Sequence, residues 1–290
     1  MPEPSILIIG AGRMGRGLGL ALTQQQATVR LYSRSQGLLL APLAQAGSGA
    51  AALEEAVAAA KTVLLAVPDD AIGGQAVALE RTGRITGEHV VLHLSGLLTR
   101  SALAALEKTG AALGSFHPLQ TIAEPAAAPA LLRGAVAGIE GDDRAVAAGR
   151  ELAERLGMRA VELPAGGKAA YHAGASIVAN YTVTLAGLAQ RLAEQAGVPA
   201  VEARRMYLPL LEGALENLRT LGPVHGLTGP VRRGDVATLR AHLRVLDPPS
   251  AELYCRLGLA ALELAREAGL KPELAERVER LFRAWPAESS

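Results

Sequence analysis

The first chemical signature in the chain is a glycine-rich hexapeptide, GAGRMG, at residues 10–15. It follows the β-branched, apolar run 5–10 and precedes a stretch typical of a helix. In that context the first glycine permits a tight turn, the second lets backbone amides approach a pyrophosphate, and the third lets helix and strand pack closely. The hexapeptide therefore predicts a dinucleotide site, with a ligand-free helix start as the alternative. The residues assigned to it are Gly10, Gly12, Arg13, Met14 and Gly15.

The end of the second predicted strand indicates which dinucleotide binds. A site for NAD usually has an acidic residue there, which binds the ribose 2′-hydroxyl. This chain has Tyr32, Ser33, Arg34 and Ser35 instead, and none of them is acidic. Hydroxyls and a guanidinium suit a 2′-phosphate, because arginine binds phosphate through paired, charge-assisted hydrogen bonds. The sequence favours NADP as the cofactor, and the alternative is that Arg34 is a solvated loop residue.

Further candidates follow the later strands, where ligands of an open parallel sheet bind. Val67 and Pro68 would form an apolar wall for a nicotinamide ring. Ser95 and Gly96 offer a hydroxyl and close backbone amides to a small anionic substrate. His117 is expected at a strand end rather than in a core, and a structural role is its alternative.

A lysine and a histidine open the long helical stretch 166–197. Lys168 and His172 are four residues apart and share one face, with Asn180 about 80° further round that helix. Hydride transfer to a carbonyl or imine requires a proton donor or a cation for the developing negative charge, and lysine can supply either. The alternative is a snorkelling surface lysine beside a buried histidine. The chain has only four lysines, so this one is notable: Lys61, Lys108, Lys168 and Lys271.

These residues must be positioned by two domains of different architecture. Short apolar runs at 5–10, 27–33, 61–68, 89–95, 112–116, 134–140 and 158–164 alternate with helical stretches. This alternation predicts an α/β, doubly wound parallel sheet over residues 1–163, with a proline-rich loop at 123–130. Residues 164–290 lack strand patterns and predict an all-helical domain, with a Gly/Pro-rich loop at 221–235.

Composition excludes several other classes of protein. The chain has 290 residues, a net charge of +1 and no basic half, so no nucleic-acid partner is expected. No apolar run reaches the length of a membrane helix. One cysteine, Cys255, fits a reducing cytoplasm. His89 and His93 are four apart on a predicted strand without a completing ligand, so no metal site is predicted.

The motifs, taken in order, resemble a known group. GAGRMG, YSRS, AVPDDAI, HLSG, FHPLQT, KAAYHAGASIVANY and LTGPVRRGD are similar to those of Rossmann-like oxidoreductases that carry a helical C-terminal domain of formerly unknown function. That group lies in the 6-phosphogluconate-dehydrogenase-like superfamily, with ketopantoate reductases, β-hydroxyacid dehydrogenases and pyrroline-carboxylate reductases as relatives. The resemblance implies an NADP-binding domain, a helical domain that often forms a homodimer, and a substrate cleft between the domains.

The match to individual relatives is partial. Lys168 resembles the lysine of ketopantoate reductases and β-hydroxyacid dehydrogenases, but the asparagine expected one turn later is replaced by His172. Ser95–Gly96 resembles the substrate-binding segment of the hydroxyacid enzymes, and His117–Pro118 resembles the His-Pro pair of prephenate dehydrogenases.

The leading hypothesis is therefore an NADPH-dependent reductase of a small 2-oxo acid, with ketopantoate as the best single guess. Lys168 would donate a proton or stabilise an oxyanion, while His172 and His117 orient the substrate or relay a proton. Thr228 and Arg232 would reach a substrate carboxylate. A cyclic-imine reductase is the rival enzyme, and an NADP-binding sensor or scaffold is the rival outside enzymes.

Overall fold

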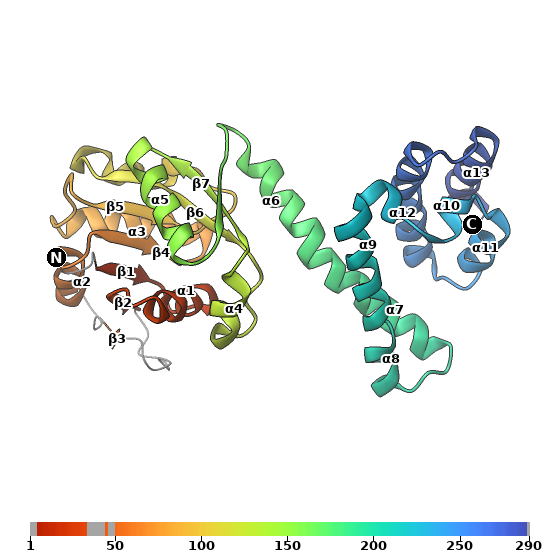
Figure 1. The fold of residues 1–290 in the computed structure, drawn as a ribbon, viewed down its shortest axis with the longest axis horizontal. Helices are drawn as coiled ribbons and strands as arrows, with labels where there is room; N and C mark the ends of the chain where they lie inside the picture. The colour runs from red at the N-terminus through yellow and green to blue at the C-terminus, as the bar shows by residue number, and fades with distance from the viewer. Residues whose placement is uncertain (1–4, 34–43, 46–49, 289–290) are drawn as a thin grey trace. The chain divides into compact units, whose positions relative to one another are not determined.

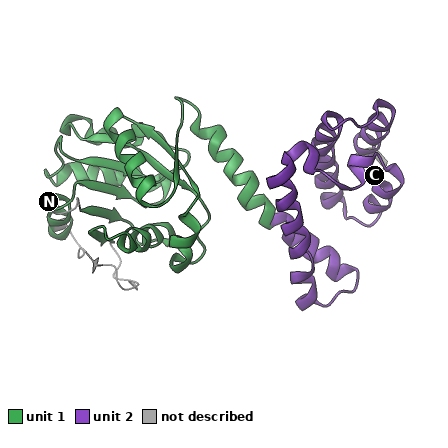
Figure 2. Ribbon diagram, viewed as in Figure 1, with its two compact units in different colours: residues 1–183 green, residues 184–290 purple. Residues whose placement is uncertain are grey.

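A computed structural model describes residues 5–33, 44–45 and 50–288. The chain forms two compact units, residues 1–183 and residues 184–290 (Figure 2). Unit 1 contains the β-sheet, and the described part of unit 2 is helical (Figure 1). The last strand ends at Glu162 and the next helix begins at Lys168. The architecture therefore changes close to residue 164, while the domain boundary itself stays a prediction.

The sheet is Rossmann-like and mostly parallel. In the described residues it has the strand order β3-β2-β1-β4-β5-β6-β7-β8. All pairs are parallel except β6 with β7, which run antiparallel. The sequence runs predicted every one of these strands except the two-residue β3. They did not predict the reversal, because hydrophobic periodicity carries no information on direction. The strands are Ile6–Ile9, Val29–Tyr32, Ala44–Gln45, Thr62–Leu65, Val90–His93, Ala112–Leu119, Val136–Gly141 and Arg159–Glu162.

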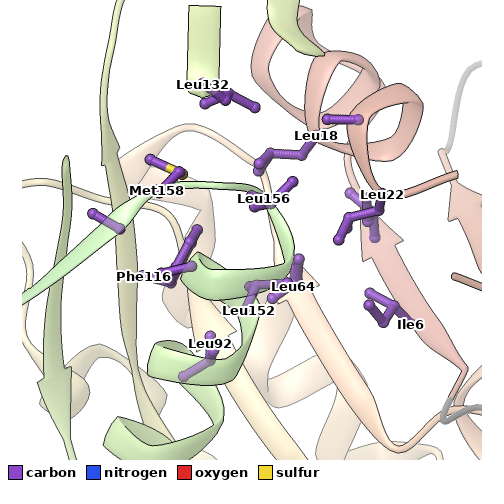
Figure 3. Close-up of a cluster of buried hydrophobic side chains, with 14 of the residues drawn as sticks. Ile6, Leu18, Leu22, Leu64, Leu92, Phe116, Leu132, Leu152, Leu156 and Met158 are labelled. Atoms are coloured by element: carbon purple, nitrogen blue, oxygen red, sulfur yellow. The ribbon is translucent and has the colours of Figure 1, made fainter. Parts of the chain in front are cut away.

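Helices cover both faces of the sheet because its strands are apolar on both sides. In β1, Ile6 and Ile8 belong to one buried cluster, whereas Leu7 and Ile9 belong to the other. The first cluster, drawn in Figure 3, also receives side chains from α1 (Arg13–Gln24), α4 (Ala128–Leu132) and α5 (Asp143–Arg155). The second receives them from α2 (Ala50–Ala58), α3 (Asp69–Arg81) and the 3₁₀ segment η1 (Arg100–Thr109).

The proline-rich stretch 123–130 corrects one expectation. It was predicted as a loop, but it forms the 3₁₀ turn η2 (Pro125–Ala127) and the start of α4. Prolines occupy first-turn positions in both elements. A first-turn residue has no intrahelical partner for its N–H, so proline is tolerated there.

The long helix predicted over 166–197 is present as one run of three segments. These are α6 (Lys168–Ser176), the π-helical segment η3 (Ile177–Tyr181) and α7 (Thr182–Gln195). Gly197, at φ +88°, follows the end of the run. A π turn inside an α-helix often marks a functional site.

Unit 2 has its own apolar core. It is built from α10 (Gly229–Arg233), α11 (Val236–Leu243), α12 (Pro248–Glu267) and α13 (Pro272–Glu288). Two further helices, α8 (Ala200–Met206) and α9 (Leu208–Gly226), precede them. The stretch 221–235 was predicted as a loop, yet it contains the end of α9 and all of α10. Gly222, at φ +70°, absorbs the break inside α9. Within the described residues no helix is both long and apolar enough to cross a membrane.

Candidate active site

In the glycine loop between β1 and α1, backbone atoms lie very close to one another. Gly10 has φ +116°, and a Cβ placed on it would lie 2.3 Å from the carbonyl oxygen of Ala66. A Cβ on Gly15 would lie 2.1 Å from the carbonyl oxygen of Gly10. Both positions therefore require glycine for the turn and for the packing of α1 against the sheet.

Gly12 differs from these two because a Cβ placed on it would meet no protein atom within 4 Å. It is the N-cap of α1, and no side chain caps that helix start. The first backbone amides of a helix lack intrahelical partners and favour an anion. The open face at Gly12 and the uncapped helix start fit the pyrophosphate of a dinucleotide. Arg13 is exposed and Met14 is partly buried beside them.

A cleft of about 640 Å³ lies at the carboxyl ends of β1, β2 and β4. Gly10, Ser33, Val67 and Pro68, four of the predicted cofactor-binding residues, line it, and their contacts with a cofactor stay predictions. None of the described side chains that line it is acidic. These lining residues are Ile9, Gly10, Tyr32, Ser33, Leu53, Val67, Pro68, Ala71, Gly74, Gln75 and Ala78. Arg34 and Ser35 lie outside the described residues, so their predicted contacts with a 2′-phosphate stay predictions.

The turn after β5 is held by Ser95, which is only 5% exposed. Its Oγ donates a hydrogen bond to Asp69 Oδ2 at 2.8 Å. The same oxygen accepts hydrogen bonds from the amides of Leu97 and Leu98 at 3.1 and 2.9 Å. These bonds shape the turn that carries Gly96, and the predicted contact of this hydroxyl with a substrate stays a prediction.

Lys168 is 2% exposed and ties the start of α6 to the turn after β5 and to the middle of β6. Its Nζ donates to the carbonyl oxygen of Ser95 at 2.8 Å and to Ser115 Oγ at 2.7 Å. Burial lowers its pKa from 10.5 to about 8, and the charges of Glu140 and Asp69 oppose that shift. At pH 7 the ammonium is therefore mostly protonated. Because Nζ contacts the backbone of the turn, Lys168 influences a ligand by its positive charge and by fixing the shape of the turn.

Two histidines meet above that turn. The rings of His117 and His172 are 5.6 Å apart, edge to face. A Cβ on Gly96 would lie 2.4 Å from His172 Nδ1 and 2.9 Å from His117 Nε2. Only glycine at position 96 lets both rings come this close. His172 Nδ1 is buried and has no hydrogen-bond partner among the described residues.

The histidine pair opens into a cavity of about 710 Å³ in unit 1. Most of its lining side chains are small or apolar, and none is acidic. Asn180, in the π segment, lines it as well, so the structure brings this predicted residue to the same cavity as His172. The lining residues are His117, Leu119, Gln120, Thr121, Tyr171, His172, Gly174, Ala175, Ser176, Val178, Ala179 and Asn180.

The histidine that ends β5 is neutral and structural. His93 is fully buried, its Nε2 lies 3.0 Å from the carbonyl oxygen of Thr99, and its Nδ1 accepts from the amide of Ser95 at 3.3 Å. Burial lowers its pKa from 6.5 to about 4. Burial, with the charges of His172 and Lys168, lowers the pKa of His117 to about 4.

The structure thus groups five of the eight predicted catalytic and substrate residues around one turn. Ser95, Gly96, His117, Lys168 and His172 are brought together, but their catalytic or substrate roles stay predictions. Two predicted substrate residues belong to unit 2. Thr228 is the N-cap of α10, and Arg232 donates to the carbonyl oxygen of Ala268 at 2.8 Å. Their substrate roles also stay predictions.

Sequence reasoning missed three residues of this network: Asp69, Ser115 and Tyr171. Asp69 is the first acid after a strand, inside AVPDDAI, and Ser115 directly precedes FHPLQT. Tyr171 is three residues after Lys168 and so falls near its face of α6. Each was therefore visible within or beside a motif, but no spacing rule distinguished it from a core or capping residue.

Comparison with known proteins defines the class first. Residues 5–87 match the model of the NAD-binding domain of 6-phosphogluconate dehydrogenase. With the fold described above, this match identifies an oxidoreductase with an NAD(P)-binding fold. Residues 135–281, just over half of the chain, match the family model Domain of unknown function (DUF2520). The chain belongs to the DUF2520 family.

Solved structures share the fold across nearly the whole chain. BF3122 from Bacteroides fragilis is 21% identical with a TM-score of 0.64, and covers 92% of this chain and 98% of its own. TM1727 from Thermotoga maritima is 24% identical, with a TM-score of 0.62 and coverages of 98% and 99%. The pyrroline carboxylate reductase of Plasmodium falciparum, solved with NADP bound, is 15% identical, with a TM-score of 0.58 and 100% coverage of both chains. No curated protein sequence matches the chain.

The glycine loop gives the first testable prediction. Gly12→Ala adds a Cβ that meets no protein atom within 4 Å, so the melting temperature should not change. The same Cβ narrows the approach of a pyrophosphate, so NADPH affinity should fall at least tenfold, or about 1.4 kcal/mol. Calorimetric titration measures this loss. Gly213→Ala on α9, which also meets nothing within 4 Å, is the control. Equal affinity in both variants would show that the loop does not bind the cofactor.

The lowered pKa values of two buried histidines predict that the fold loses stability in acid. His93 and His117 have a pKa of about 4 in the fold against 6.5 in the unfolded chain. Between these values the unfolded chain binds more protons, so the free energy of unfolding should fall as pH drops from 6.5 towards 4, by up to ~1.4 kcal/mol per pH unit for each histidine. Urea titrations at pH 6.5 and 5 measure the slope. His117→Gln should reduce it, whereas the exposed His225→Gln should not; a slope of zero in the wild type contradicts the prediction.

Proposed function

We propose that this protein is an NADPH-dependent reductase of a small 2-oxo acid, with ketopantoate as the first substrate to test. The observation that carries the proposal is the cavity lined by His117 and His172, beside the turn that the buried Lys168 holds, where none of the described lining side chains is acidic.

The charge of this site favours a substrate that becomes more negative during the reaction. Lys168 is mostly protonated at neutral pH, and within the described part of the chain its ammonium group has two hydrogen-bond partners, both uncharged. Its positive charge is therefore not cancelled by direct pairing, although Asp69 and Glu140 lie near enough to stabilise it. A carbonyl oxygen that gains negative charge is stabilised in such a field, whereas an iminium cation is not.

The residues divide their work as follows. When bound, the nicotinamide supplies the hydride. Gly10, Gly12 and the start of α1 bind the cofactor's pyrophosphate. Lys168 fixes the turn at Ser95 and supplies positive potential. His117, in its neutral state, donates a hydrogen bond to the reacting carbonyl oxygen. Hydride transfer would leave an alkoxide on that carbon, and water would supply the proton that completes the alcohol.

The preference for NADP over NAD rests on the end of β2. The described residues Tyr32 and Ser33 line the cofactor cleft without an acidic side chain that would bind a free 2′-hydroxyl. NADP fits a reaction that runs in the reductive direction. We also propose a reducing cytoplasm as the compartment, because the one cysteine, Cys255, is a buried free thiol.

Reduction of a cyclic imine is the second candidate. The apolar majority of the cavity lining favours it, because a neutral imine has little charge to solvate. An imine reductase from Myxococcus stipitatus and a reductive aminase from Aspergillus terreus also share the fold, with TM-scores of 0.54 and 0.56. The charge of Lys168 makes the carbonyl the preferred substrate.

We further propose a homodimer that is formed through α9. This helix of 19 residues contains no buried residue. Leu208, Leu211, Leu215 and Leu218 recur at spacings of three and four, which places them on one face, and each is between 43% and 54% exposed. Such an apolar stripe is uncommon on a monomer. A second copy is the natural occupant, because an uncharged stripe is complementary to itself across a two-fold axis.

The activity test measures NADPH oxidation with a panel of 2-oxo acids and cyclic imines, and NADP⁺ reduction with β-hydroxyacids. We expect turnover of a 2-oxo acid. Lys168→Met should lower kcat by about 10²-fold, the size of effect seen when one electrostatic stabiliser is lost, while NADPH binding is retained. Lys271→Met, an exposed matched substitution, should keep full activity.

Each other outcome of this panel decides against the proposal. Turnover of imines alone makes the protein an imine reductase. NADPH binding without any turnover supports a sensor or scaffold. Full activity of Lys168→Met, with circular dichroism equal to the wild type, removes the lysine from the mechanism.

The dimer predicts a mass of twice 29.9 kDa by light scattering at micromolar concentration. The double variant Leu211→Asp, Leu215→Asp places charges in the stripe and should yield monomers, because burying unpaired carboxylates is costly. Val245→Asp, at another exposed apolar residue of unit 2, should remain dimeric. A monomeric wild type would contradict the proposal.

A further inference from the structure

Tyr171 contacts the histidine that faces the cavity. It lies on α6 between Lys168 and His172, and its hydroxyl is 3.0 Å from His117 Nδ1. The two rings meet edge to face, with centroids 5.5 Å apart and planes at 85°. The hydroxyl is also 3.5 Å from the carbonyl oxygen of His117, a longer and weaker contact.

The position of this hydroxyl depends on a missing side chain in the neighbouring strand. Gly138 of β7 is paired in register with His117 of β6. A Cβ on Gly138 would lie 2.7 Å from the Tyr171 hydroxyl oxygen and 2.8 Å from the ring carbon that carries it. Because residue 138 has no side chain, there is space for the phenol of Tyr171 to pack against His117.

The surroundings of the phenol oxygen indicate which atom carries the proton between Tyr171 and His117 Nδ1. The backbone amide of Gly138 faces the phenol oxygen and opposes the rise in the pKa of Tyr171 that burial causes, and an amide N–H can only donate. The phenol oxygen thus accepts from Gly138 and retains its own proton to give. Burial raises the pKa of Tyr171, so it stays protonated. His117 Nδ1 is the nearer acceptor, and the neutral ring then carries its proton on Nε2.

The other ring nitrogen of His117 is directed at the turn. A Cβ on Gly96 would lie 2.9 Å from Nε2. In the described part of the chain Nε2 makes no hydrogen bond of its own, and His117 is one of the residues that line the cavity. A proton on Nε2 is therefore available to a ligand.

We propose that Tyr171 is a positioning residue whose hydroxyl holds His117 in the Nε2–H tautomer, so that the site presents a neutral N–H donor to the substrate. The inference rests on the proposed function and narrows its substrate class. The reacting atom must accept a hydrogen bond, as a carbonyl oxygen does. A protonated imine would bring a second donor to the same point.

The groups that bear on His117 are few. His172 and Lys168 disfavour its protonation by their charge, Asp69 favours it, and Tyr171 bonds to the neutral ring. A donor to the neutral form lowers the pKa of an imidazole. Removal of the phenol hydroxyl should therefore raise the pKa of His117 and free its tautomer.

The test is nitrogen-15 NMR of the ligand-free protein with labelled histidine. The chain has six histidines, and the spectrum of His117→Gln assigns the signals of His117. In the wild type we expect an unprotonated Nδ1 and a protonated Nε2. In Tyr171→Phe the two tautomers should mix and the pKa of His117 should rise. The matched control is Tyr254→Phe, because Tyr254 forms the same kind of pair with His242 at 2.8 Å in unit 2.

Kinetics on an active substrate complete the test. Tyr171→Phe should lower kcat about tenfold without changing NADPH affinity. A proton on Nδ1 in the wild type, or an unchanged tautomer in Tyr171→Phe, overturns the inference. If Tyr171→Phe does not fold, Gly138→Ala displaces the hydroxyl from the other side and should give the same NMR change. A tautomer change without turnover of any substrate refutes the proposed function but not the role of Tyr171.

Discussion

The site depends on one buried ammonium group. Lys168 places a positive charge where water does not reach it, which is unfavourable unless its protons have partners. The carbonyl oxygen of Ser95, in the turn after β5, and the hydroxyl of Ser115, in the middle of the neighbouring parallel strand β6, supply two of them. The bond to Ser95 fixes the turn before Gly96, and the bond to Ser115 fixes the approach of α6 to β6. Because α6 begins at this lysine, Tyr171 and His172 one turn later fall beside His117.

Glycines allow the close atomic contacts of this site. At Gly10 and Gly15 they bring strand, loop and helix together around the cofactor loop. At Gly96 and Gly138 they create room for imidazole and phenol rings, which could not approach a backbone that carried a Cβ. The same residue type thus serves two different ends in unit 1. In the loop it brings backbone to backbone, and at the cavity it brings side chain to backbone.

The sequence predicted the parts of the fold that depend on local patterns. Buried strands such as 6–9 and 62–65 are continuous apolar runs, and the glycine spacing at Gly10 to Gly15 is tied to a known backbone geometry. The antiparallel direction of β7 was not predictable, because a strand reads alike in both directions. The helices at 125–132 and 229–233 were hidden by prolines that occupy first-turn positions. Hydrogen-bond partners that are distant in sequence, such as Asp69 for Ser95, have no local signature at all.

The π segment η3 brings a polar side chain, that of Asn180, to the cavity lining. In a regular α-helix, Asn180 would point about 80° away from His172. A π turn takes up roughly one residue more than an α turn, so each residue within it is rotated less about the helix axis than in an α-helix. This smaller rotation reduces the angular offset, and Asn180 lines the same cavity as His172. The amide is thus delivered by an irregularity of the backbone rather than by the spacing of side chains. Loss of a single residue here would keep the helix and turn the amide aside.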